Sequence, residues 1–148
     1  MAPPADLPHA DPPLPIDDAD GGSDTGEPAA RRVWTGEHPG IPIDPDADVI
    51  SDRGAEVYSV LRASGREHLL ILGVHTNMCI LNRSFAIKQM VRWGVDTVLL
   101  RDLTDAMYNP ASRPYVSHDE GTRLVIGYIE KFWCPTALSA DLLRGAAD

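Results

Sequence analysis

A run of four large aliphatic residues occupies positions 69–72 and ends at Gly73, and it limits the possible folds more than any other segment. The run has no polar alternation, as is typical of a strand buried on both faces of a parallel sheet. Residues 73–77 predict a tight turn, and residues 78–93 predict a helix with an apolar face. Residues 95–100 predict the next strand, which completes a βαβ unit. We therefore expect an α/β fold with a parallel sheet and a ligand site at the carboxyl ends of its strands.

Further elements are predicted around this unit. A helix is expected over residues 51–64, with its first serine as the N-cap. A second helix is expected over residues 118–132, where apolar residues recur at core spacing and Ser117 is the N-cap. A long irregular loop is expected at residues 101–116, and a short strand at residues 135–138.

The chain divides into two parts by composition. Residues 1–33 are expected to be a flexible acidic segment, because residues 1–30 hold seven prolines, seven acidic residues and few large aliphatic residues. Those seven acidic residues supply most of the net charge of −9, so the rest of the chain is nearly balanced. Residues 34–148 are expected to form the α/β domain, with Trp34 and residues 41–43 extending toward its core.

Composition excludes several classes of protein. The chain has a net negative charge and no cluster of Lys or Arg, so we expect no nucleic-acid partner. No apolar run approaches the roughly 20 residues that a membrane span needs, and no signal region follows Met1, so we expect a soluble cytoplasmic protein without a membrane partner. Cys79 and Cys134 are expected to be reduced there. We expect a small-molecule substrate, and neither a cofactor nor a metal.

Cys79 is the main candidate for chemistry. It lies in the first turn of a predicted helix, where free backbone N–H groups and the positive end of the helix dipole favour a thiolate. Position alone therefore makes Cys79 a candidate nucleophile. The alternative is that Cys79 fills space beneath the helix, as buried cysteines commonly do. Cys134, which precedes Pro135, is expected only to fill space.

The residues around Cys79 carry a resemblance to a known family. The strand ends in a glycine and an aliphatic residue, a threonine follows, and the cysteine comes three residues after it; these residues are Gly73, Val74, Thr76 and Cys79. This pattern, with Asp105 followed by Ala106 after the next strand, resembles the isochorismatase-like cysteine hydrolases, which include nicotinamidases and N-carbamoyl amide hydrolases. The resemblance covers roughly residues 34–143.

The resemblance implies both a fold and a reaction. The implied fold is a three-layer, Rossmann-like arrangement around the parallel sheet. Cys79 would attack the carbonyl carbon of a small amide or related C–N bond and form a thioester. A cis peptide between Val74 and His75 would aim the N–H groups of His75 and Cys79 at the substrate carbonyl as an oxyanion hole.

Further residues are candidates for contacts with substrate. They are Val74, Thr76, Asn77, Arg101 and Asp105. The side chain of His75 is equally suited to a structural hydrogen bond. Arg101 and Asp105 could instead form an ion pair and a turn that stabilise the loop after their strand.

The sequence departs from the family pattern upstream of Cys79. The family pairs its cysteine with an Asp at the end of a first strand and with a Lys, and both precede the cysteine. Here no apolar run precedes Val57, and the only lysines are Lys88 and Lys131. We therefore expect a partial domain that lacks its N-terminal strand or strands, in a truncated chain. The alternative is a catalytically inactive binding or scaffold protein, and in either case the chain could form a homo-oligomer.

Overall fold

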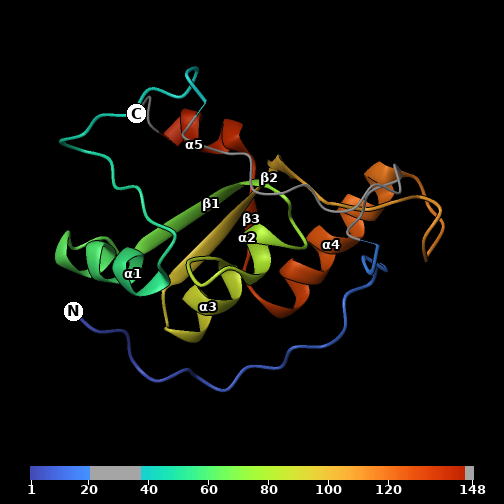
Figure 1. Ribbon diagram of the computed structural model, residues 1–148, viewed down its shortest axis with the longest axis horizontal. Coiled ribbons are helices and arrows are strands. Elements are labelled where there is room, and N and C mark those ends of the chain that lie inside the picture. The colour runs from blue at the N-terminus through green and yellow to red at the C-terminus, as the bar shows by residue number, and fades with distance from the viewer. Residues whose placement is uncertain (21–37, 146–148) are drawn as a thin grey trace.

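The computed structural model describes residues 1–20 and 38–145 and confirms an α/β fold with a parallel sheet. The strands follow the order β1, β2 and β3 (Figure 1). They span His68–Val74 (β1), Asp96–Asp105 (β2) and Thr136–Ala137 (β3). The short strand predicted at residues 135–138 is therefore present. Trp34, which was expected to reach the core, lies outside the described residues. The same expectation for residues 41–43 is wrong, because Ile41 and Ile43 are 56% and 40% exposed.

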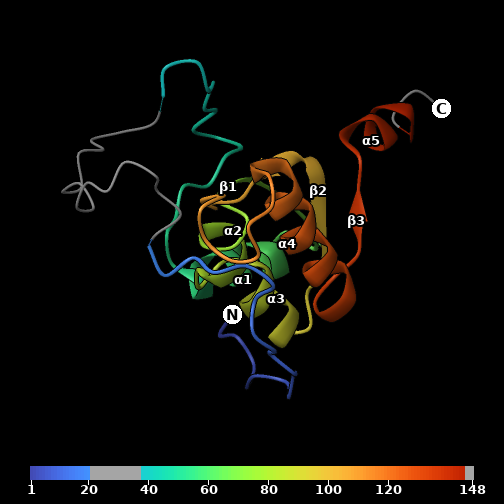
Figure 2. The ribbon, with the colours of Figure 1, turned by 90° about the vertical axis from the view of Figure 1, so that its right-hand side faces the viewer.

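Helices α1 to α4 lie on one side of the strands, and α5 lies on the other side (Figures 1 and 2). The helices are α1 (Gly54–Ala63), α2 (Cys79–Asn82), α3 (Ile87–Arg92), α4 (His118–Phe132) and α5 (Ser139–Gly145). α4 has the predicted bounds, and its cap is confirmed because Ser117 Oγ accepts a hydrogen bond from the Glu120 N–H at 3.2 Å. α5 was not predicted. Within the described ranges no helix combines the length and apolarity needed to cross a membrane.

The single helix predicted over residues 78–93 is wrong, because α2 and α3 are separated by a turn at residues 83–86. The turn brings Ser84 against the start of α1, where Ser84 Oγ accepts a hydrogen bond from the Gly54 N–H at 3.1 Å. The two segments meet so closely that a Cβ at Gly54 would overlap the Ser84 carbonyl. This contact joins positions 30 residues apart, so helical periodicity could not indicate the break.

The start of α1 also differs from the prediction. Arg53, rather than Ser51, occupies the N-cap position. Ser51 Oγ instead accepts a hydrogen bond from the Arg53 N–H at 3.1 Å and donates one to the Glu56 carboxylate at 2.6 Å. Ser51 therefore shapes the turn that leads into the helix without capping it.

β1 is not buried on both faces as predicted. It is an edge strand, and its residues alternate between partly buried and exposed. Leu69 and Ile71 face the helices, whereas Leu70, Leu72 and Val74 are 40%, 52% and 58% exposed. The physical reason is that α1 to α4 cover only one face of the strand. Of the layers implied by the resemblance, the described residues supply one complete helical layer and, on the other side, only α5.

β2 is longer than predicted and contains a bulge. The loop expected to start at residue 101 starts after Asp105, because residues 101–105 belong to the strand. Between Ile71 and Gly73, β1 advances by two residues, while their partners Leu99 and Thr104 are five residues apart. β2 thus carries three extra residues there, and pairing resumes so that Asp105 lies opposite Val74. The bulge determines which side chains of β2 reach the end of the sheet.

Residues 1–20, which we call the strap, run along the helical side of the domain. In Figure 1 the blue trace passes below α1 and α3 and then rises beside α4. Asp11 pairs with Lys88 Nζ at 2.7 Å and accepts a hydrogen bond from the Tyr128 hydroxyl at 3.0 Å. Ile16 is only 6% exposed and belongs to the main core cluster. The acidic segment thus contributes to the core, and the boundary expected at residue 34 lies outside the described residues.

Candidate functional site

The turn after β1 has a defined backbone. The peptide between Val74 and His75 is cis, as the resemblance implied. Gly73 has a φ of +117°, a conformation that favours glycine over residues with a side chain. The Thr76 N–H donates to the Asp105 carbonyl at 2.9 Å, so the turn is tied to the end of β2. The N–H groups of Met78 and Ile80 both donate to the His75 carbonyl, at 3.0 and 3.1 Å.

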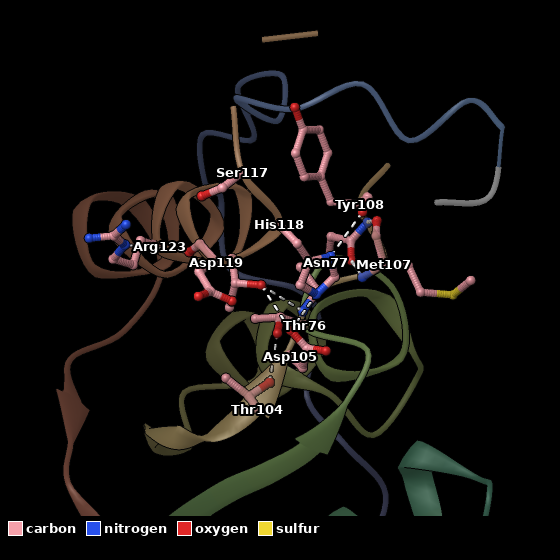
Figure 3. A network of polar contacts seen from close by, with 12 residues as sticks. Thr76, Asn77, Thr104, Asp105, Met107, Tyr108, Ser117, His118, Asp119 and Arg123 are labelled. Atoms are coloured by element: carbon pink, nitrogen blue, oxygen red, sulfur yellow. Dashed lines mark hydrogen bonds and ion pairs between the residues drawn. The ribbon is translucent and has the colours of Figure 1, made fainter. Parts of the chain in front are cut away.

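The side chains of Thr76 and Asn77 support this turn from below. Both residues are 0% exposed. The hydroxyls of Thr76 and Thr104 share a hydrogen bond of 2.7 Å, which links the turn to β2. Asn77 forms two hydrogen bonds to the backbone of Met107, donating to its carbonyl and accepting from its N–H (Figure 3). Because both side chains are buried and hydrogen-bonded within the protein, they stabilise the turn.

Cys79 is the first residue of α2 and is partly exposed. It lines a cavity of about 250 Å³ together with residues 69–72 of β1. Val57 of α1 and Phe85 contribute to the same apolar wall. Four consecutive strand residues line the cavity, so it follows the outer edge of β1. The sequence predicted that Cys79 lies in the first turn of a helix over residues 78–93. The helix α2 has only four residues, so its dipole is that of a single turn.

The remaining predicted site residues occupy different surroundings. His75 is partly buried in the turn, and Val74 is 58% exposed on the uncovered side of β1. Arg101 lies within the bulged part of β2 and donates a hydrogen bond to Thr136 Oγ1 of β3 at 3.0 Å. The structure therefore joins Thr76, Asn77 and Asp105 around the turn, and it directs Arg101 toward β3.

Asp105 and His118 form an ion pair beside the turn (Figure 3). His118 Nε2 donates to the Asp105 carboxylate at 2.9 Å, and His118 Nδ1 donates to the Tyr108 carbonyl at 3.0 Å. The Tyr108 carbonyl first, and then Asp105, raise the pKa of His118, because both acceptors favour the doubly protonated ring. Burial alone would raise the pKa of Asp105, but hydrogen bonds from His118 and Thr122 hold it below its ordinary value.

These pKa shifts define a pH window for the pair. The contribution of His118 to stability is complete below its ordinary pKa of 6.5 and is lost as the pH rises through the raised pKa of the folded state. The contribution of Asp105 is complete above its ordinary pKa of 3.8 and is lost as the pH falls through the lowered pKa. The pair should therefore stabilise the fold most between about pH 4.5 and pH 6.

We expect His118→Gln to lower the free energy of unfolding by about 1 kcal/mol at pH 5.5, and by clearly less at pH 8.5. The magnitude is modest because the side chains of His118 and Asp105 are 42% and 55% exposed. Urea denaturation of both proteins at the two pH values measures this difference. A destabilisation of equal size at pH 5.5 and pH 8.5 would mean that the charge on His118 does not contribute.

Two residues beside the turn were not identified from the sequence. From the sequence, His118 was interpreted mainly as part of a helix start. Asp18, whose carboxylate accepts a hydrogen bond from Asn77 Nδ2 at 2.9 Å, was not considered. A resemblance between short motifs could not indicate either contact, since Asp18 and Asn77 are 59 residues apart.

Lys88 and Asp11 form an acid–lysine pair away from the turn, between α3 and α4.

Comparisons of the chain with models of known protein families, with curated proteins and with solved structures found no match. Among the described residues, no group of three or more His, Cys, Asp or Glu side chains is arranged to hold a metal ion.

Proposed function

We propose that the protein is a cysteine hydrolase of the isochorismatase-like type, which cleaves a small amide or related C–N bond with Cys79 as the nucleophile. The observation that carries this proposal is the position of Cys79. It is partly exposed, it directly follows the turn that ends β1, and it lines a cavity of about 250 Å³. The cis peptide between Val74 and His75 agrees with the backbone that the resemblance implied.

The proposed reaction starts with attack of Cys79 Sγ on the carbonyl carbon of the substrate. The N–H groups of His75 and Cys79 would stabilise the negative charge that develops on the carbonyl oxygen. The C–N bond then breaks, the amine leaves with the proton that the Cys79 thiol gave up, and a thioester remains until water hydrolyses it to the acid and the free thiol. Asp105 and His118 are the titratable pair that is connected to the turn, through the hydrogen bond from the Thr76 N–H to the Asp105 carbonyl.

The apolar wall of the cavity suggests the class of substrate. Its lining residues are predominantly aliphatic or aromatic, with the thiol of Cys79 as the reactive group. A cavity of about 250 Å³ is at or below the lower end of the range for sites that hold small organic ligands. We therefore propose a compact, uncharged amide as the substrate.

A catalytically inactive binding protein is the second candidate. The observation that favours it is the location of Lys88 and Asp11, which pair with each other between α3 and α4. Lys88 Nζ also lies over the ring of Trp133, 5.3 Å from its centroid. Lys88 therefore has structural partners, and the family's lysine beside the cysteine has no counterpart among the described residues.

The test is hydrolysis of a panel of small amides by the unmodified protein, Cys79→Ala and Cys134→Ala. We expect turnover by the unmodified protein, and a loss of about 10³-fold or more in kcat/KM for Cys79→Ala, because the nucleophile is removed. Cys134→Ala is the matched control, since Cys134 is buried in the core and its loss should change turnover only a few-fold.

Two outcomes would count against the hydrolase. Turnover that survives Cys79→Ala would exclude Cys79 as the nucleophile. An absence of turnover across the panel, together with saturable binding of an amide by the unmodified protein, would favour the binding protein.

A further inference from the structure

The strap places the carboxylate of Asp18 beside the turn that precedes Cys79. Ile16 is buried in the main core cluster, and the Asp17 N–H donates to the Arg113 carbonyl at 2.9 Å. These two anchors fix the backbone immediately before Asp18. The half-buried carboxylate of Asp18 accepts a hydrogen bond from Asn77 Nδ2 at 2.9 Å.

This contact completes the hydrogen bonding of a buried amide. Asn77 is 0% exposed, and Nδ2 also donates to the Met107 carbonyl at 3.0 Å, while Oδ1 accepts from the Met107 N–H at 2.9 Å (Figure 3). An amide has two N–H donors, and here one is used by Met107 and the other by Asp18. Without Asp18, one N–H of a fully buried side chain would lose its partner, which is costly in a protein interior.

Asn77 in turn holds the segment that contains Cys79. It precedes Cys79 by two residues, and its backbone carbonyl accepts a hydrogen bond from Asn82 Nδ2 at 2.8 Å. Asn82 is the last residue of α2, so Asn77 is connected to the far end of the helix that Cys79 begins. Asn77 also connects this segment to Met107, just beyond β2.

We infer that Asp18 is a positioning residue for Cys79, and that the acidic strap is thereby part of the site. Asp18 holds the amide of Asn77, and Asn77 holds the turn and α2 in the arrangement that directs Cys79 to the cavity. The inference rests on the proposed function, because it assumes that the thiol of Cys79 is the group that the protein positions.

The test compares Asp18→Ala with Asp18→Asn and with Asp17→Ala as the matched control. Asp18→Ala removes the acceptor, whereas Asp18→Asn keeps an oxygen that can accept from Asn77. Asp17→Ala removes the same charge at the adjacent position. The carboxylate of Asp17 is exposed and accepts a hydrogen bond from the Ala19 N–H. Two rates are measured in the full chain under native conditions: alkylation of Cys79 by iodoacetamide, followed by mass, and hydrogen exchange of the Met107 amide.

We expect Asp18→Ala to speed exchange at Met107 about tenfold, because the buried contact opens more often. Alkylation of Cys79 should rise by about threefold or more, because more frequent opening of the turn adds to the access that the partly exposed thiol already has. Asp18→Asn should return both rates toward those of the unmodified protein, and Asp17→Ala should change neither.

Equal rates in Asp18→Ala and Asp17→Ala would overturn the inference. Faster exchange at Met107 with unchanged alkylation of Cys79 would overturn it as well, because Asp18 would then support the fold without positioning the thiol. Neither measurement needs amide hydrolysis. If the protein hydrolyses no amide but both rates change in Asp18→Ala as expected, the proposed function is contradicted and the role of Asp18 still holds.

Discussion

Iodoacetamide is expected to label Cys79 at least about a hundredfold faster than Cys134 at pH 8. Burial raises the pKa of Cys134 to about 11, so only about one Cys134 thiol in a thousand is ionised at this pH. Cys134 is also only 5% exposed, which limits access of the reagent. Cys79 is partly exposed and lines a cavity, so the reagent can reach it in the folded protein.

The experiment follows both sites in one sample by peptide mass after timed quenching. The control is the same labelling in denaturing urea, where both cysteines are accessible and their rates should converge. Equally slow labelling of the two cysteines in the folded protein would indicate that Cys79 is a space-filling residue, the alternative that its position in the sequence left open. Labelling of Cys134 first would contradict its burial in the core.

The second large effect is expected from Gly121→Ala in α4, which should lower the free energy of unfolding by about 3 kcal/mol. A Cβ at this position would lie only 2.7 Å from Cγ of Tyr108, closer than real side chains approach one another. Tyr108 is 2% exposed, and its hydroxyl donates to the Ser112 carbonyl at 2.8 Å and accepts from the Val116 N–H at 3.2 Å. The ring therefore cannot move without disturbing the loop after β2.

Gly127→Ala in the same helix is the matched control. Apart from the neighbouring residues and backbone of α4 itself, no atom lies within 4 Å of a Cβ at Gly127, so alanine adds helix propensity without a clash. We expect this variant to be more stable than the unmodified protein by up to about 1 kcal/mol. Urea denaturation of the three proteins separates steric overlap from helix propensity, and equal stability of the two variants would contradict the packing of Tyr108 on α4.

The parts of the fold that the sequence predicted correctly depend on local signals. α4 has the predicted bounds because its N-cap, Ser117, and the apolar spacing that follows act within one segment. β1 was found because four adjacent aliphatic residues precede a glycine. Its exposure was predicted wrongly, because an uninterrupted aliphatic run reads alike whether one or both faces of the strand are covered. Only the position of the helices around the strand decides between the two.

The features that were missed depend on contacts between distant segments. The break between α2 and α3 follows from the approach of Ser84 to Gly54, and the bulge in β2 is visible only from its pairing with β1. In the site, the sequence indicated Cys79 and the turn, and the resemblance indicated the cis peptide. Neither the sequence pattern nor the resemblance could indicate the contact between Asp18 and Asn77. An acidic residue among prolines has the same local pattern whether or not it has a buried partner.

The strap also has a consequence for the order in which the chain can fold. Asp11 and Tyr128, which are joined by a hydrogen bond, are 117 residues apart in the sequence. At about 5–20 residues per second, a ribosome would synthesise Tyr128 roughly 6 to 23 seconds after Asp11. Throughout that interval Ile16 has no complete core to enter, and the hydrogen bond of Asp11 to Tyr128 can form only after α4 has been made. The segment around Asp11 and Ile16, although synthesised early, can therefore complete its native contacts only once α4 is present.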